Sequence, residues 1–294
     1  MKIVLGPASK ELGEKIAKFV NAETVPVAFK TFPDGETYTR LEGEVRNEDV
    51  FIVQTTSPPQ DSRLFQLAFM VDAAKRSGAK SVTAVVPYLA YVRQDKAFLQ
   101  GESVSIETVA RMLKAAGIDS LLTVNVREEV LNRFPFPSKS LSAVPLLAEH
   151  FRQHGFAEAF VLAPDEGALR IAEQARRVLG GDCGYMEKRR DRYTGRITVK
   201  RNEKFEVKGR TVIIFDDIIS TGGTTTAATK IMKEQGAERV FAACVHPLMI
   251  GEAEKRILEA GAEEIVGTDS VPSRVSKVSL APLLSDALKE HRSG

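Results

Sequence analysis

The sequence predicts an α/β protein made of two duplicated domains, each a mainly parallel sheet flanked by helices. Short apolar runs rich in Val, Ile and Leu alternate with longer segments of helical period through most of the chain. This alternation is typical of strands that are joined by helices and buried on both faces. Two segments of the first half also recur in the same order in the second half, which indicates a duplication.

The first half contains four apolar runs that we predict to be strands. Three segments of helical period lie among them and end near Gly or Asn, residues that commonly terminate helices. The predicted strands are residues 2–6, 49–56, 81–89 and 120–126, and the predicted helices are residues 11–21, 62–78 and 105–117.

The second half repeats this rhythm of strand and helix. Its apolar runs have the same length and composition, and its helical segments again end near Gly. The predicted strands are residues 159–165, 211–217, 239–248 and 264–271, and the predicted helices are residues 167–181, 224–236 and 251–261.

Two pairs of segments relate the halves to each other. Residues 75–89 resemble residues 233–248, and residues 114–125 resemble residues 258–269, although the loops between them differ in length. We interpret this as an internal duplication. The alternative is convergence, because Gly after a helix and β-branched residues in a strand occur in many α/β chains. The predicted domains are residues 1–143 and 144–294.

Composition bounds the cellular setting and the classes of partner. The chain has 294 residues, 43% of them hydrophobic, and a net charge of only +2, so we expect no nucleic-acid surface. The apolar run at the N-terminus is too short for a signal peptide, and no run approaches the roughly 20 apolar residues that span a bilayer. We expect a cytoplasmic protein without membrane contact, whose Cys183 and Cys244 are buried free thiols.

Residues 211–228, TVIIFDDIISTGGTTTAA, predict an anion site at the end of a strand. Asp216 and Asp217 end the strand, residues 220–224 form a turn, and a helix starts at Thr225. The two glycines of the turn permit positive φ, so successive amides and the helix N-terminus can hold an anion. No Lys follows the glycines, so the turn is not a P-loop and suits a monophosphate group.

The two carboxylates at the mouth of this turn indicate what the rest of the ligand is. They would repel a phosphate, but they suit hydroxyl groups or a metal ion a few ångströms away. A sugar phosphate presents both features, with a phosphate at one end and vicinal hydroxyls at the other. The alternative is that Asp217 only caps the turn and the threonines only cap the helix.

Residues 215–225, FDDIISTGGTT, resemble the ribose-phosphate loop of the type I phosphoribosyltransferase-like fold. This fold includes the phosphoribosyltransferases and the ribose-phosphate pyrophosphokinases, also called phosphoribosyl pyrophosphate synthases. The resemblance to the pyrophosphokinases extends over nearly the whole chain. Four further segments carry it: FPDGE at 32–36, YVRQDK at 91–96, APDEG at 163–167 and MEKRRD at 186–191.

The resemblance implies a fold, a reaction and a set of site residues. The fold is two phosphoribosyltransferase-like domains. The reaction transfers the β,γ-diphosphate of ATP to the 1-hydroxyl of ribose 5-phosphate and gives phosphoribosyl pyrophosphate and AMP. Mg²⁺ is the implied cofactor, with Asp165 as a metal ligand and Lys188 and Arg190 as catalytic cations. The implied ATP site is Phe32, Asp34, Glu36, Arg93 and Gln94, and the implied ribose 5-phosphate site is Asp216, Asp217, Ser220, Thr221, Gly222, Gly223 and Thr224.

The chemistry of these residues fits the implied roles, although each residue alone has a simpler explanation. The ring of Phe32 can stack on a base, but a lone Phe is more often a core residue. Arg93 presents a planar fork for a base or a phosphate, but it can also be a surface cation. Residues 187–196 are predicted to form a flexible hairpin that closes cations over the diphosphate, although charged runs usually face solvent. Many members have Asp at the position of Ser220, where a hydroxyl is compatible with phosphate.

One motif departs from the family. Many members have Asp-Leu-His after the strand that reads LLTVNVREEV here, and that His is a magnesium ligand. This chain has Asn125, Val126 and Arg127, and Arg cannot ligate a metal. Arg127 could contact the ATP phosphates, Glu128 or Glu129 could supply an oxygen, or the site could tolerate the loss.

Two alternatives to an active pyrophosphokinase stay open, namely a non-catalytic regulatory homologue and a phosphoribosyltransferase. Asp165, Lys188 and Arg190 are all retained, which argues against a decayed enzyme. The resemblance also implies a homo-oligomer built from dimers, up to a hexamer, with ADP or phosphate as an effector.

Overall fold

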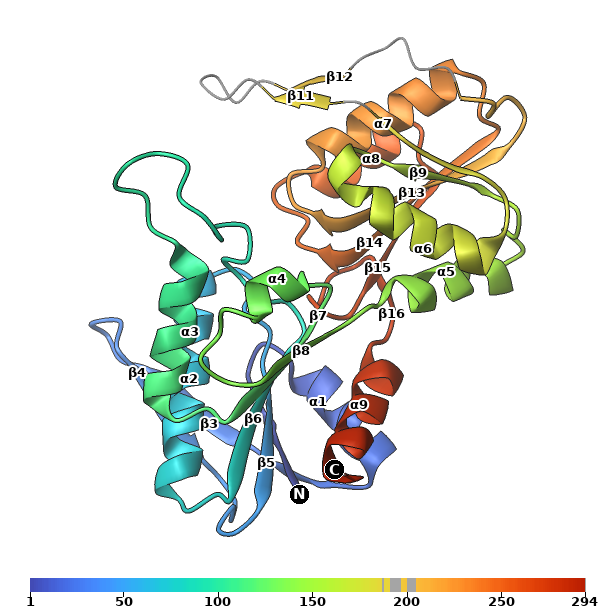
Figure 1. Cartoon of the computed structure of the whole chain (residues 1–294). Coiled ribbons are helices and arrows are strands. Elements are labelled where there is room, and N and C mark those ends of the chain that lie inside the picture. Colours follow the sequence, from blue (N-terminus) through green and yellow to red (C-terminus); the bar gives the residue numbers. More distant parts are fainter. Residues whose placement is uncertain (187, 191–196, 200–204, 294) are drawn as a thin grey trace. The chain divides into compact units, whose positions relative to one another are not determined.

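The computed structural model describes residues 1–186, 188–190, 197–199 and 205–293 (Figure 1). The chain divides into two compact units, and each contains a parallel six-stranded sheet with helices on both faces. This architecture confirms the predicted fold class. Unit 1 comprises residues 1–142, 270–272 and 279–294, and unit 2 comprises residues 143–269 and 273–278.

Six strands form the sheet of unit 1. They are β1 (Lys2–Leu5), β2 (Glu23–Val25), β5 (Asp49–Val53), β6 (Ser81–Val86), β7 (Ser120–Val124) and β8 (Ser138–Leu141). Their order is β2-β1-β5-β6-β7-β8, and all neighbours are parallel. The four inner strands coincide with the predicted apolar runs. The two edge strands escaped prediction because they are short and only partly buried.

Helices cover both faces of this sheet. They are α1 (Lys10–Val20), α2 (Gln60–Arg76), α3 (Ser105–Ala116), the short α4 (Glu128–Leu131) and α9 (Ala281–Ser293). One face packs on α2 and α3, where Ile52, Val82 and Leu113 belong to a single buried cluster. The other face carries α1 and α9, which contact each other (Figure 1). An antiparallel hairpin, β3 (Val27–Thr31) and β4 (Thr37–Leu41), packs beside α2.

Unit 2 repeats this plan. Its strands are β9 (Phe160–Ala163), β10 (Cys183–Tyr185), β13 (Thr211–Ile219), β14 (Arg239–Pro247), β15 (Glu264–Thr268) and β16 (Ser276–Val278). Its helices are α5 (Val144–Gln153), the 3-10 turn η1 (Glu166–Ala168), α6 (Leu169–Leu179), α7 (Gly223–Glu234) and α8 (Ala253–Glu259). The strand order β10-β9-β13-β14-β15-β16 is that of unit 1 strand for strand, which confirms the predicted duplication.

The last helix of each repeat belongs to the other unit. α5 follows β8 but packs on α6 in unit 2, while α9 follows β16 but packs on α1 in unit 1. The two helices are also similar in sequence, since residues 143–151 read AVPLLAEHF and residues 280–288 read LAPLLSDAL. The units therefore differ from the predicted domains at the C-terminus. Residues 279–294 join unit 1 because α9 carries the buried Leu284 and Leu288 against it.

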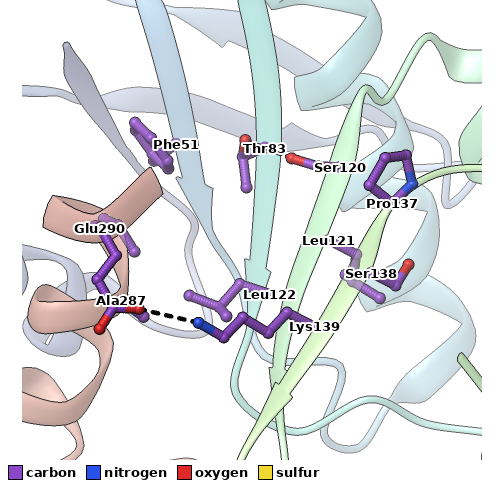
Figure 2. Close-up of a pocket in the computed structure, with 11 residues that line it drawn as sticks. Phe51, Thr83, Ser120, Leu121, Leu122, Pro137, Ser138, Lys139, Ala287 and Glu290 are labelled. Atoms are coloured by element: carbon purple, nitrogen blue, oxygen red, sulfur yellow. Dashed lines mark hydrogen bonds and ion pairs between the residues drawn. The ribbon is translucent and has the colours of Figure 1, made fainter. Parts of the chain in front are cut away.

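A cavity of about 300 Å³ lies between α9 and strands β6 to β8 (Figure 2). The ion pair of Lys139 and Glu290, 3.0 Å apart, links β8 to α9 beside it. In the repeat alignment, Thr83 of its lining matches Phe241 of unit 2, whose ring packs on Phe151 at 5.9 Å between centroids. A small side chain thus leaves space in unit 1 that an aromatic ring fills in unit 2.

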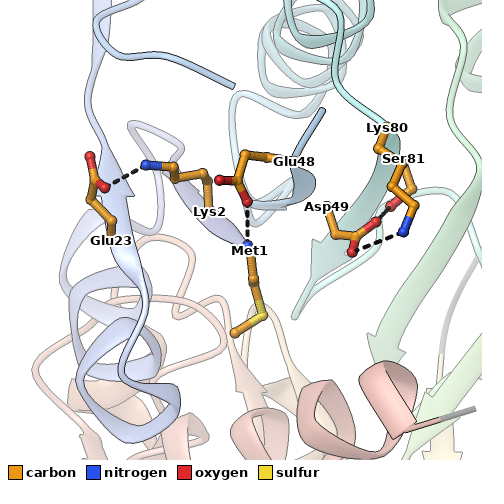
Figure 3. Close-up of polar contacts among 7 residues, drawn as sticks. All are labelled: Met1, Lys2, Glu23, Glu48, Asp49, Lys80 and Ser81. Atoms are coloured by element: carbon orange, nitrogen blue, oxygen red, sulfur yellow. Dashed lines mark hydrogen bonds and ion pairs between the residues drawn. The ribbon is translucent and has the colours of Figure 1, made fainter. Parts of the chain in front are cut away.

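Ion pairs join the amino ends of the strands in unit 1 (Figure 3). The amino terminus of Met1 pairs with Glu48 and lowers the pKa of that carboxyl, and Lys2 pairs with Glu23. Such partly exposed pairs stabilise a fold only weakly. They lie at the edge opposite the strand carboxyl ends, where ligands bind in sheets of this kind.

No described helix is long and apolar enough to cross a membrane. Both cysteines are free, as predicted. Cys244 is buried in the central strand β14, whereas Cys183 is only partly buried, because β10 lies at the edge of its sheet.

Candidate active site

The carboxyl end of β13 carries both predicted aspartates. The strand continues to Ile219, two residues beyond the predicted end, so Asp216 and Asp217 lie within it. Each carboxylate accepts a hydrogen bond from the next amide, Asp217 N–H to Asp216 Oδ1 at 2.8 Å and Ile218 N–H to Asp217 Oδ1 at 2.7 Å. These local bonds hold both partly buried side chains at the strand end.

The turn that follows is shaped by Gly222. Its φ of 76° lies in the left-handed region, and a Cβ there would lie 3.1 Å from Ile257 and 3.2 Å from Ala253 of α8. Gly223 begins α7, two residues earlier than predicted, and an added Cβ there would meet no atom within 4 Å. Of the two glycines, one is required for packing and the other leaves an open approach to the backbone.

The turn is held from outside by backbone contacts. The Ile250 amide donates to Ser220 O at 3.0 Å, and the Arg256 guanidinium donates to Thr221 O. The N-cap residue of α7 is Gly222, which has no side chain to cap the helix. The amides of the first turn of a helix have no partner within that helix, so a fixed turn of this kind suits an anion.

Charge is concentrated beside this turn. Burial raises the pKa of Asp216 well above its usual range, and the carboxylates of Asp217 and Asp165 raise it further. Burial also raises the pKa of the Cys244 thiol, which pairs with Asp216 across β13 and β14. A cation or a set of hydroxyl donors would relieve this accumulation of negative charge.

Asp165 follows β9 at the same edge of the unit 2 sheet. Its Oδ1 accepts the Ala168 amide at 3.2 Å and so caps η1. The described residues contain no group of three or more His, Cys, Asp or Glu side chains arranged to hold a metal. Asp165 and Asp216 interact electrostatically, and one or two carboxylates suffice for Mg²⁺, because this ion keeps several of its waters.

In unit 1, three of the predicted residues lie at the tip of the β3–β4 hairpin. The Phe32 amide donates to Glu36 O at 2.8 Å, and the Glu36 amide donates to Asp34 Oδ1 at 3.1 Å, which closes the turn. Phe32 is 38% exposed, so it is not a core residue, which is the simpler explanation for a lone Phe. The Lys30 ammonium lies 5.0 Å from the centroid of this ring.

Arg93 and Gln94 are exposed in the loop after β6. The start of the loop is held from below, because the Ala90 amide donates to Thr56 Oγ1 at 2.7 Å. Tyr91 has a left-handed φ of 68°, and its hydroxyl donates to the Asp61 carboxylate. A non-glycine residue persists in this conformation only where its surroundings fix it.

Arg127, the residue that departs from the family motif, is bound to the same loop. Its Nη2 donates to Asp95 Oδ2 at 2.7 Å. The Asp95 side chain is 10% exposed, whereas that of Arg127 is 64% exposed. Arg127 is thus paired with a buried carboxylate. This arrangement differs from the three expected from the sequence, which are contact with the ATP phosphates, a replacement ligand from Glu128 or Glu129, and tolerance of the lost ligand.

Known protein families match both halves of the chain. Residues 1–117 match the N-terminal domain of ribose phosphate pyrophosphokinase, and residues 142–279 match the phosphoribosyl transferase domain. The ribose-phosphate pyrophosphokinase of Methanothermobacter thermautotrophicus is 40% identical over 284 residues, which cover 96% of this chain and 98% of that protein. That of Saccharolobus solfataricus is 38% identical over 272 residues, with 92% and 93% coverage.

A solved structure gives the same result. The crystal structure of phosphoribosylpyrophosphate synthetase from Mycobacterium smegmatis superposes with a TM-score of 0.88 at 31% identity, covering 100% of this chain and 99% of that one. The chain belongs to the ribose-phosphate pyrophosphokinase family. Because both halves match, the family accounts for the duplicated architecture, which a phosphoribosyltransferase would not need.

Two residues predicted to be catalytic lie on a small two-stranded sheet. Lys188 and Arg190 belong to β11 (Lys188–Arg190), which pairs antiparallel with β12 (Ile197–Val199). The predicted charged hairpin at 187–196 overlaps this sheet, but residues 187 and 191–196 lie outside the described part of the chain. The side chains of Lys188 and Arg190 lie outside it as well.

Sequence reasoning missed the residues that support the loop carrying Arg93 and Gln94. Asp95 belongs to a segment that resembles the pyrophosphokinases, yet its partner Arg127 is 32 residues away. Tyr91 is 30 residues away from its partner Asp61. Residue spacing alone contains no signal for these pairs, because they form only when β5, β6 and β7 lie side by side.

Proposed function

We propose that the chain transfers the β,γ-diphosphate of ATP to the 1-hydroxyl of ribose 5-phosphate and releases phosphoribosyl pyrophosphate and AMP. The observation that carries the proposal is the glycine turn at the start of α7, directly beside Asp216 and Asp217 in unit 2. Relatives named ribose-phosphate pyrophosphokinase that match almost the full length of the chain support it.

The acceptor is held by the turn and by the strand end. The amides of residues 220–224, with the hydroxyls of Ser220, Thr221 and Thr224, bind the 5-phosphate at the helix N-terminus. Asp216 and Asp217 accept hydrogen bonds from the ribose hydroxyls. Burial disfavours the ionised form of Asp216, and hydroxyl donors of a bound ribose would favour it.

The donor is held by residues of unit 1. Phe32 stacks on the adenine, Asp34 and Glu36 bind its polar edge, and Arg93 and Gln94 bind the nucleotide from the loop after β6. The exposure of the Phe32 ring supports this assignment, because a stacking platform must be open to solvent before the base arrives.

Catalysis rests on positioning and on cationic groups around the transferred diphosphate. Lys188 and Arg190 stabilise the negative charge that develops there and help to exclude water. Mg²⁺ is the expected cofactor, with Asp165 among its ligands and the neighbouring Asp216 and Asp217 as further oxygen donors. When bound, the ion neutralises phosphate charge and polarises the transferred group.

The test is a direct assay. Purified protein, ATP, MgCl2 and ribose 5-phosphate are mixed, and AMP is measured by chromatography, with the sugar phosphate omitted as control. AMP that forms only with ribose 5-phosphate supports the proposal. Tight nucleotide binding without AMP would favour a regulatory homologue, and failure to bind nucleotide would favour a phosphoribosyltransferase.

We further propose a cytoplasmic homo-oligomer built from dimers, up to a hexamer, with ADP or inorganic phosphate as an effector. Equilibrium sedimentation measures the oligomer, and titration of the AMP-forming assay with ADP or phosphate measures the effector. A monomer at the concentration of the assay would contradict the proposed oligomer. A rate that is insensitive to both ADP and phosphate would contradict the proposed effector.

A further inference from the structure

The loop between β6 and α3 is fixed on both sides of Arg93 and Gln94. On one side, Tyr91 holds a left-handed φ and donates to Asp61 on α2. On the other side, Asp95 turns inward and is buried. An exposed pair of side chains is thus placed between two anchored residues, so its position depends on both anchors.

The second anchor is made by two arginines that flank α4. Arg127 Nη2 donates to Asp95 Oδ2 at 2.7 Å, and Arg133 Nη1 donates to the backbone oxygen of Asp95. Arg133 also lies 3.8 Å from Glu107 on α3, which ties α4 to that helix. The side chain and the backbone of Asp95 are therefore both held from the turn after β7.

A buried carboxylate requires a cationic partner, and its removal leaves an unpaired charge. We infer that Arg127 is a positioning residue: through Asp95 it fixes the loop that presents Arg93 and Gln94 to the nucleotide. This inference rests on the proposed function and assigns a role to the residue that replaces the family's histidine. Arg127 acts on the nucleotide through the loop and not by direct contact with its phosphates.

The inference makes a specific prediction for binding. The variant Arg127→Gln weakens the binding of ATP and of AMP about equally, by roughly tenfold, which corresponds to about 1.4 kcal/mol. The two affinities fall equally because a displaced loop moves Arg93 and Gln94, which are proposed to contact both nucleotides. The KM for ATP rises by a similar factor while kcat changes less than about threefold, since the diphosphate-binding cations are elsewhere.

A double-mutant cycle isolates the ion pair. Binding is measured by calorimetry with the full chain at fixed MgCl2, and amide exchange is followed in a peptide spanning residues 87–96. In an Asp95→Asn background, Arg127→Gln has a smaller effect than in the parent chain, because the partner is already altered. Arg127→Lys, which keeps the charge, restores part of the affinity. The matched control is Arg111→Gln, an exposed arginine on α3 that lies 3.8 Å from Glu107.

Three results would overturn the inference. They are a loss of ATP affinity at least tenfold larger than the loss of AMP affinity, additive effects in the cycle, and exchange of residues 87–96 unchanged from the parent. If Arg127→Gln does not fold, as judged by circular dichroism, the amide exchange of residues 87–96 is compared in Arg127→Lys and Asp95→Asn instead. A parent chain that forms no AMP would refute the proposed function. The amide-exchange measurement on residues 87–96 would still test whether Arg127 holds the loop through Asp95.

Discussion

At the scale of single residues, Gly222 is a position in the candidate site where backbone conformation and packing both disfavour a side chain. Its φ is left-handed, and the Cβ of Gly222→Ala would lie 3.1 Å from Ile257 and 3.2 Å from Ala253, so the change strains the turn and its packing on α8. We expect this change to lower stability by about 1–2 kcal/mol. Because the turn carries the anion-binding amides, we also expect affinity for ribose 5-phosphate to fall at least about tenfold.

Denaturant unfolding and calorimetric titration with ribose 5-phosphate measure these two effects. Gly223→Ala is the matched control for stability alone, since an added Cβ there meets open space and Ala favours a helix. Equal stability losses in the two variants would contradict the role assigned to Gly222.

Asp216 links the site to pH. Its folded-state pKa is raised, so the folded protein binds the proton more tightly than the unfolded chain does, and this group's ionisation lowers stability as pH rises above about 4. Asp216→Asn removes the effect. The margin by which its melting temperature exceeds that of the parent should therefore grow from pH 4.5 to pH 8.

Thermal unfolding without ligand at pH 4.5, 6 and 8 measures this margin. A margin that shrinks with rising pH would show that Asp216 is stabilised in its ionised form. The same variant should lose ribose 5-phosphate binding, so the residue lowers the stability of the free protein but serves the ligand.

At the scale of elements, the strand β11 allows a prediction about the catalytic cations. Lys188→Ala should lower kcat by roughly 100-fold or more, with KM for both substrates changing only a few fold, because the cation acts on charge that develops during transfer. Arg189→Ala is the control, since it removes one positive charge from the same strand, between the two proposed catalytic residues. Near-normal turnover in Lys188→Ala would refute the catalytic role.

Elements differ in how well the sequence predicts them. The inner strands β5, β6, β13 and β14 were predicted to within a few residues, because burial on both faces imposes continuous apolar runs. The edge strands β2 and β16 have three residues each and were missed. At the site, the turn after β13 was predicted because its chemistry is local, although α7 begins two residues earlier than expected. The Arg127–Asp95 pair was not, because it depends on which strands are neighbours.

At the scale of the whole molecule, the last helix of each repeat packs in the other unit, so α9 at the C-terminus packs on α1 near the N-terminus. Leu284 of α9 is fully buried, so Leu284→Ala should lower the free energy of unfolding by about 2–4 kcal/mol. Although this residue is near the C-terminus, the loss should fall on unit 1. Hydrogen exchange should accelerate in β1 and α1 and stay unchanged in β14 and β15.

The control for this prediction is Leu258→Ala on α8, where the side chain is 39% exposed and a smaller loss is expected. Faster exchange confined to unit 2 in the Leu284 variant would contradict the assignment of α9 to unit 1. Neither α5 nor α9 was predicted from the sequence, and residues 280–288 contain no local signal for the unit on which they pack.

The position of α9 also bears on how the chain folds as it leaves the ribosome. The strands of unit 1 emerge first, but the helix that packs beside α1 is encoded in residues 281–293. Unit 2 has its counterpart helix, α5, ahead of all its strands and can close as soon as β16 is made. The unit that is synthesised first is therefore completed last, and during that interval nascent unit 1 exposes apolar surface that a chaperone can bind.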